Sequence, residues 1–96
     1  MKRRALRRRY GHAGKRRSAA AYAFLRNMHG WTITSERGDL LVAHRMASVQ
    51  GEEPGPDVEF MRVKHGREFR WRAFYNGRVG VGFSPFGAAR DVGVPR

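Results

Sequence analysis

The segment from Glu68 to Asp91, EFRWRAFYNGRVGVGFSPFGAARD, constrains the fold more than any other part of the chain. Its opening residues alternate between two faces, which predicts a β-strand. The pair Asn76-Gly77 predicts a tight turn, and the residues after it predict a second strand. Ser84 is a suitable N-cap and Pro85 a suitable first residue for a helix of two or three turns. The segment therefore predicts an antiparallel hairpin followed by a short helix.

The length of this turn decides which side chains share a face, because a slip of one residue moves every side chain to the other face. A two-residue loop would place Arg72 opposite Val81. A three-residue loop, Tyr75 to Gly77, places Trp71 opposite Val81 and makes one face wholly apolar, so we expect this register. The other face then combines basic, aromatic and glycine residues, namely Arg70, Arg72, Phe74, Gly80 and Gly82.

Three further elements are expected before this segment. Residues 18–29 predict an amphipathic helix, capped by Ser18 and followed by Gly30, with one apolar stripe made of Ala21, Phe24, Leu25 and Met28. Residues 31–46 predict a hairpin that turns at residues 37–39. One of its faces joins Trp31 and Ile33 to Leu41 and Ala43, and the other is half apolar, as a face covered by a helix would be. Residues 58–64 predict a third strand in a similar bulged register, which pairs Met61 with Phe69.

These elements predict an α+β fold: an antiparallel sheet of about five strands, with an N-terminal helix and a short C-terminal helix. Residues 1–17 are expected to form a basic, flexible and disordered arm, residues 18–96 a single small domain, and residues 92–96 a frayed tail. Residues 47–57, rich in glycine and proline, predict a loop. A domain of this size needs large side chains in its core, and we expect the aromatic ones to be Trp31, Phe60, Phe69, Trp71 and Phe83.

The net charge of +12 is concentrated at one end of the chain. The first 17 residues carry nine basic and no acidic side chains, whereas residues 18–96 carry eleven basic and eight acidic ones. Arginine binds phosphate through several donors, and an aromatic ring among arginines can stack on a base. The arm is therefore expected to bind a polyanion through Arg3, Arg4, Arg7, Arg8, Arg9, Tyr10, Lys15, Arg16 and Arg17. A solubilising tail is the alternative interpretation.

The body carries a second group of basic residues. In the expected register Arg62, Arg70 and Arg72 share a face with Phe74, and the glycines opposite them would let a phosphate backbone approach closely. We expect these three arginines to extend the nucleic-acid site. The alternative is a solvated arginine face on which the N-terminal helix partly covers Phe74.

Several other classes of function find little support in the sequence. The chain has no cysteine, and its four histidines show no metal-ligand spacing, so neither a metal site nor a cofactor is expected. No serine lies in a nucleophile motif, and an enzyme is not expected; a small ribonuclease using His44 or His65 is the catalytic alternative. Neither a secretory signal nor a membrane span is expected, because the apolar run after Arg17 is short and ends at Arg26. A small protein without cysteine fits the cytoplasm.

Two resemblances accompany these patterns. GPDVEF followed by FRWRAFYNGRVGVGFSPFGAAR resembles the second half of a double-stranded-RNA-binding domain, which implies a final helix that contacts phosphate. The lysine-rich clamp that opens this helix in the family is missing, since Arg90 is the one basic residue from Ser84 to Arg90. KRRALRRRYG resembles the start of small basic proteins of bacteriophages and mobile elements of bacteria, which implies a phage context, the cytoplasm of a bacterial host cell and an association with virions.

The sequence thus predicts a non-catalytic nucleic-acid-binding protein of low specificity, because phosphate contacts carry no sequence information. DNA and RNA both remain open as partners. The alternative is a protein-interaction module, such as a phage structural component or an inhibitor of a host protein. In that case a sheet edge, or a surface around Trp31 and Trp71, would dock the protein partner.

Overall fold

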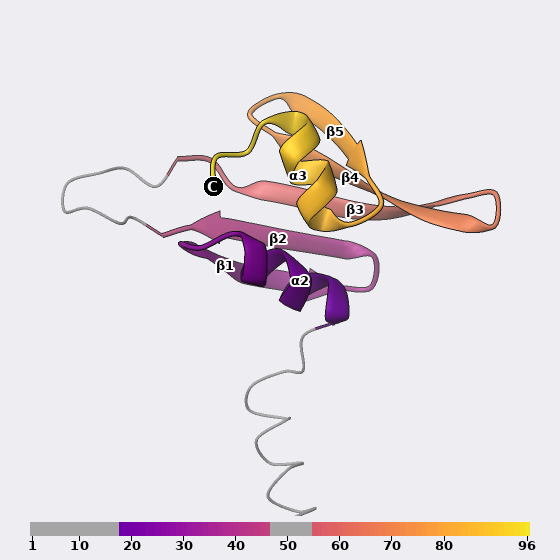
Figure 1. The fold of residues 1–96 in the computed structure, drawn as a ribbon, viewed down its shortest axis with the longest axis horizontal. Helices are drawn as coiled ribbons and strands as arrows, with labels where there is room; N and C mark the ends of the chain where they lie inside the picture. Colours follow the sequence, from indigo (N-terminus) through magenta and orange to yellow (C-terminus); the bar gives the residue numbers. More distant parts are fainter. Residues whose placement is uncertain (1–17, 47–54) are drawn as a thin grey trace, which may run out of the picture.

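The computed structural model describes residues 18–46 and 55–96 and confirms the α+β fold (Figure 1). The expectations for the arm, residues 1–17, and for most of the glycine- and proline-rich loop lie outside the described residues. The elements are α2 (Ala19–Asn27), β1 (Trp31–Arg37), β2 (Leu40–Arg45), β3 (Val58–His65), β4 (Glu68–Tyr75), β5 (Arg78–Gly82) and α3 (Pro85–Val92).

The five strands form one antiparallel sheet in the order β1-β2-β3-β4-β5, so each strand pairs with its neighbour in the sequence. Figure 1 shows both helices on the same side of this sheet. We call that side the helix face and the opposite side the open face. Because α2 and α3 both lie on the helix face, no described helix covers the open face.

The core lies between the two helices and the helix face. Phe24 of α2 makes edge-on ring contacts with Phe60 of β3, at a centroid distance of 5.1 Å, and with Trp31 of β1, at 6.2 Å. Ala21, Phe24 and Met28 are buried and Leu25 is partly buried, which confirms the apolar stripe expected for this helix. The Ser18 hydroxyl accepts a hydrogen bond from the amide of Ala21, as its predicted role as N-cap requires.

The last helix is capped at both ends. Ser84 Oγ accepts a hydrogen bond of 3.1 Å from the amide of Gly87, and Pro85 opens the helix as expected. At the other end the amide of Val94 donates to the carbonyl of Ala89 over 2.9 Å, a bond typical of the Schellman motif. Val94 is buried in the core, so the expectation of a frayed tail was wrong.

The turn between β4 and β5 has two residues and not three. Tyr75 pairs with Arg78 and Arg72 with Val81, which is the register that the sequence analysis rejected. Asn76 and Gly77 have φ angles of 51° and 78°, and two successive positive angles fit a type I′ turn, whose twist matches that of the flanking strands. The two-residue turn therefore sets the register, although a three-residue turn would have made one face of the hairpin wholly apolar.

This register moves two glycines to the helix face. A Cβ atom on Gly80 would lie 2.5 Å from the carbonyl oxygen of Ala88, and one on Gly82 would lie 2.5 Å from the amide of Ala88. The absence of side chains at these positions therefore lets α3 lie directly against β5. The expectation that Gly80 and Gly82 lower the arginine face for a phosphate backbone was wrong.

Two other turns depart from the expected registers. The turn between β3 and β4 also has two residues, Gly66 and Arg67, so Met61 pairs with Arg72 and not with Phe69. The turn between β1 and β2 is short as well, since Arg37 pairs with Leu40. The odd residue expected in this hairpin lies instead in a β-bulge between Ile33 and Ser35.

Because of this bulge, the four side chains predicted to share one face of the β1–β2 hairpin do share it. Trp31, Leu41 and Ala43 are buried, and Ile33 packs against the core. The opposite side of this hairpin lies on the open face, where Leu40 is exposed, and no described helix covers it as had been expected. Two aromatic residues expected in the core also lie outside it, since Phe69 is 49% exposed and Phe83 is 75% exposed.

Candidate nucleic-acid interface

The central part of the open face consists of three rows of side chains that cross the strands. The pairing registers define the first row as Arg37, Leu40, Met61, Arg72 and Val81. The second row is Ser35, Val42, Glu59, Phe74 and Val79. The third is shorter and contains Val63, Arg70 and Phe83. Eight of these thirteen side chains are apolar, three are arginines and one is a carboxylate.

Most of this apolar surface is open to solvent. Leu40, Met61, Val79, Val81 and Phe83 all belong to the exposed large hydrophobic residues of the described chain. A contiguous apolar patch of this kind on a protein surface usually marks an interaction site. The open face is therefore the main candidate functional surface among the described residues.

Arg70 and Arg72 lie on this face with Phe74, as the sequence predicted. The guanidinium of Arg70 lies 4.1 Å from the centroid of the Phe83 ring and 2.8 Å from a carboxylate oxygen of Glu68. Arg70 is thus held in place by two neighbours. Arg72 is exposed in the middle of the first row, between Met61 and Val81.

The third predicted arginine of the body lies elsewhere. Arg62 pairs with Trp71 on the helix face. Its guanidinium contacts the carboxylate of Asp39 at 2.8 Å and lies 4.7 Å from the centroid of the exposed Phe69 ring. The expectation that Arg62 shares a face with Arg70 and Arg72 was therefore wrong, and the two-residue turn after His65 is the reason.

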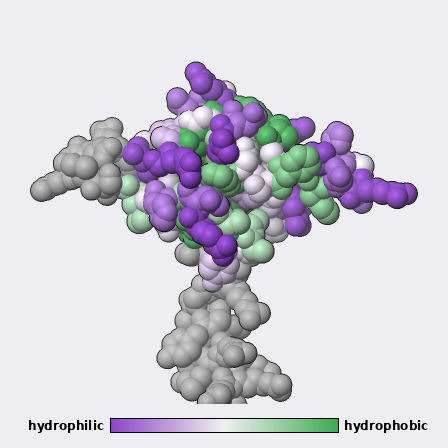
Figure 2. Space-filling view, in the orientation of Figure 1, coloured by the Kyte–Doolittle hydropathy of each residue, from purple (hydrophilic) through white to green (hydrophobic). Residues whose placement is uncertain are grey.

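The outer part of the β3–β4 hairpin projects beyond the other strands (Figure 1). Pairing with β2 stops at Met61 and pairing with β5 stops at Trp71, so the residues between them form a two-stranded ribbon. Lys64 and Arg67 lie on this ribbon and are exposed. Figure 2 shows hydrophilic residues gathered at this projecting end. The ribbon thus adds basic groups beside the open face.

The arm residues predicted to bind phosphate, from Arg3 to Arg17, lie outside the described part of the chain. The structure does place the residue that follows them. The Ser18 amide donates a hydrogen bond of 3.0 Å to Glu36 Oε1 on β1, which fixes the start of α2 beside an edge of the sheet. Ser18, the residue that follows the arm in the sequence, therefore lies next to β1.

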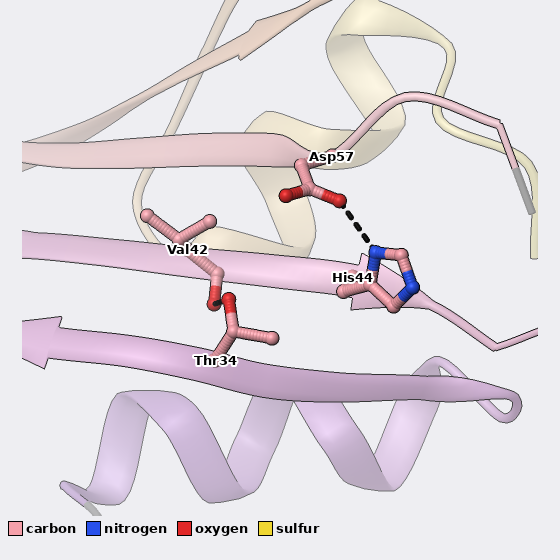
Figure 3. Close-up of polar contacts among 4 residues, drawn as sticks. All are labelled: Thr34, Val42, His44 and Asp57. Atoms are coloured by element: carbon pink, nitrogen blue, oxygen red, sulfur yellow. Dashed lines mark hydrogen bonds and ion pairs between the residues drawn. The ribbon is translucent and has the colours of Figure 1, made fainter.

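His44 and Asp57 form the closest polar contact on the open side of β2 and β3 (Figure 3). His44 Nδ1 lies 2.6 Å from Asp57 Oδ1, and the two side chains join the end of β2 to the start of β3. A carboxylate that orients a histidine is one part of a catalytic triad, which also needs a nucleophile. Thr32 pairs with His44 across the strands, but no described serine or threonine forms a hydrogen bond with it. Thr34 instead donates to the carbonyl of Val42 over 3.4 Å. The pair thus ties the two strands together.

Other kinds of site can be checked only over residues 18–46 and 55–96. In these ranges no three histidine or acidic side chains cluster as ligands for a metal ion. Neither described helix has the length and apolar character needed to cross a membrane.

The surfaces suggested for a protein partner are mostly occupied. Trp31 is buried, and its indole nitrogen donates to the carbonyl of Pro95 over 3.2 Å, while Trp71 packs against the core. At one sheet edge Asp91 of α3 accepts a hydrogen bond of 2.9 Å from the amide of Val81. At the other edge the bulge interrupts β1. Both features hinder the addition of a further strand.

The exposure of the β5 side chains and of Phe83 was not expected from the sequence. The signal that would have revealed it is the dipeptide Asn-Gly, which favours a two-residue hairpin turn.

Comparisons of the chain with protein-family models, with curated proteins and with solved structures found no match.

Proposed function

We propose that this protein is a non-catalytic nucleic-acid-binding protein of low sequence specificity. The observation that carries the proposal is the arm, in which nine of 17 side chains are basic and none is acidic. The resemblance of its first residues to small basic phage proteins agrees with such a role. The exposed arginines and aromatic rings of the open face support the same class of ligand.

The mechanism is electrostatic. Each arm residue that neutralises a phosphate releases a condensed counterion, so affinity falls steeply as salt rises. Arginines at the arm contact phosphates without reading bases, which gives affinity without sequence specificity. Residues 18–96 have a net charge of only +3 and contribute less to this term.

A protein-interaction module is the second candidate, and the apolar open face is the observation that favours it. Eight apolar side chains on one side of a sheet exceed what phosphate contacts require. Nucleic-acid affinity near physiological salt separates the two functions, because an interaction module does not need it.

A salt titration tests the proposal. Binding of the full-length protein to duplex DNA, duplex RNA and single-stranded RNA is measured by fluorescence anisotropy, beside a variant that lacks residues 1–17. On B-DNA the slope of log affinity against log salt is expected to become less steep by about 0.9 for each phosphate contact that is lost. A variant with lysine at every arginine of the arm keeps the charge and is expected to keep most of the slope.

Two results would contradict this function. The first is a full-length protein that binds none of these nucleic acids at about 0.15 M salt. The second is a slope that stays unchanged when the arm is removed. A capture experiment for a protein partner would then be the next step.

A further inference from the structure

The arm accounts for affinity but leaves the open face unexplained. Phosphates interact with charged groups, yet five of the apolar residues on this face are exposed. Exposing so much apolar surface is unfavourable unless a ligand covers it for part of the time. The ligand should therefore have both apolar surfaces and negative charge.

Unpaired bases joined by phosphates have this combination of properties. Proteins that bind single strands use aromatic side chains on which bases stack, together with basic groups that follow the backbone. On the open face, Phe83 is 75% exposed and Phe74 is partly exposed. Arg70, Arg72 and Phe74 follow one another along this face of β4, and the Arg70 guanidinium lies over the Phe83 ring, so basic and aromatic groups lie side by side.

The rings of Phe83 and Phe74 are also too far apart to stack on the same base. Phe83 lies opposite Arg70 across the hairpin, four residues along β4 from Phe74, which corresponds to roughly 13 Å. The two rings would therefore contact different bases. Arg70 lies over one side of the Phe83 ring at 4.1 Å, so a base that stacks on the other side would complete a sandwich.

A duplex fits this face less well. Its bases are stacked on one another and offer only their edges, within grooves that admit a helix or a two-stranded ribbon but not the face of a wide sheet. A duplex lying on the open face would present phosphates to Leu40, Met61, Val79 and Val81, which offer no hydrogen bonds. The apolar rows would then gain nothing from binding.

A second copy of the chain is a weaker match on grounds of charge. Each copy has a net charge of +12, and a two-fold contact through the open face would bring Arg70 and Arg72 of both copies together. Arg72 has no ion pair with any described residue, so the contact would bury it without a partner unless the other copy supplied one. A nucleic-acid strand supplies phosphates for the same side chain.

We infer that the open face binds single-stranded nucleic acid, with bases stacked on Phe83 and Phe74 and the backbone held by Arg70 and Arg72. This inference rests on the proposed function and adds the substrate class to it. The arm supplies general attraction to phosphate, and the open face selects unpaired strands over duplexes.

The helix face provides a matched control for the test. Phe69 is also an exposed aromatic residue beneath an arginine, Arg62, but it lies on the other side of the sheet. Full-length Phe83→Ala and Phe69→Ala variants are titrated with a single strand of about 16 nucleotides, with the matching duplex, and with an abasic strand of the same length. The abasic strand keeps the phosphates and lacks the bases.

The expected result is selective. Phe83→Ala should weaken binding to the single strand by roughly 5- to 150-fold, the range for loss of one base stack. It should leave the duplex and abasic affinities within about twofold, and Phe69→Ala should leave all three unchanged. Phe83→Trp should retain the affinity of the parent protein, and its added tryptophan emission should be quenched by the single strand but not by the abasic strand.

Three outcomes would overturn the inference, and one of them would also overturn the proposed function. If the parent protein binds no nucleic acid, the proposed function itself is wrong and this inference falls with it. If the parent binds but Phe83→Ala matches Phe69→Ala, only the inference is overturned, and the arm alone explains binding. If sedimentation shows a dimer that Phe83→Ala dissociates, the open face joins two copies and the inference is equally overturned. Thermal unfolding of each variant verifies that it is folded.

Discussion

Gly80 is packed so closely against α3 that it leaves no room for a side chain. A methyl group there would lie 2.5 Å from the Ala88 carbonyl oxygen and 2.6 Å from the Val92 amide, both of which are backbone atoms of α3. Backbone atoms cannot rotate away as a side chain would. Gly80→Ala is therefore expected to lower the free energy of unfolding by about 1–3 kcal/mol, or more if α3 separates from the sheet. Urea denaturation monitored by circular dichroism measures this change.

Gly87, which lies in α3, provides the matched control for Gly80. A Cβ atom there meets only Ser84 Oγ, at 3.4 Å, and Gly82 Cα, at 3.8 Å. Because alanine favours a helix over glycine by about 0.8–1 kcal/mol, Gly87→Ala should leave stability unchanged or raise it by up to that amount. Equal stability of the Gly80 and Gly87 variants would contradict the close contact between β5 and α3.

The cap of α3 can be tested at a single atom. Ser84 Oγ accepts the 3.1 Å hydrogen bond from the Gly87 amide, which has no other acceptor within this short helix. Ser84→Ala should therefore cost about 1 kcal/mol of stability. Ser35 lies exposed in β1, and Ser35→Ala is expected to cost at most about 0.5 kcal/mol. A cap variant as stable as the control would show that the helix is held by packing alone.

Among the elements, the β4–β5 hairpin fixes which side chains belong to the open face. Gly77 has a φ of 78° with nothing within 4 Å of its missing Cβ, so Gly77→Ala strains the backbone without a clash. The expected cost is about 1–2 kcal/mol. Asn76→Gly, at a φ of 51°, should be close to neutral because glycine adopts this angle freely. Cross-strand contacts between Arg72 and Val81, measured by NMR, report whether the register survives.

Local patterns in the sequence predicted the elements better than their alignment. The stripe Ala21, Phe24, Met28 and the caps at Ser18 and Ser84 depend on neighbours in the same helix, and they are confirmed. The registers depend on the length of each turn, and all three hairpins have two-residue turns where longer loops were expected. Arg70 and Arg72 kept their expected neighbour Phe74 because all three lie on one strand, whereas Arg62 lies on another strand and moved to the other face.

The same reasoning explains why the open face was not foreseen. In the expected register Phe69 and Phe83 belonged to a buried face, and the glycines lay beside the arginines. Moving the partner strand by one residue exchanged those roles: the glycines lie under α3, and Val79, Val81 and Phe83 become exposed. Composition could reveal the basic arm, but no count of residue types could reveal that both helices pack on one side.

At the scale of the whole molecule, the arm and the open face should act on different steps of binding. Charges steer a ligand over distances near the Debye length and so raise the association rate, whereas short-range stacking slows dissociation. Removal of residues 1–17 is therefore expected to lower the association rate constant for a single strand by about 10-fold or more at low salt. Phe83→Ala should instead raise the dissociation rate constant and leave association within about twofold.

Stopped-flow anisotropy at several salt concentrations separates the two rate constants. The association rate of the full-length protein should fall steeply with salt, and the rate of the variant without the arm should fall much less. The dissociation of Phe83→Ala should be faster than that of Phe69→Ala at every salt concentration, since stacking involves no counterion release. If the arm deletion and Phe83→Ala both act on association alone, the two surfaces form a single electrostatic site, and the division of labour between them does not hold.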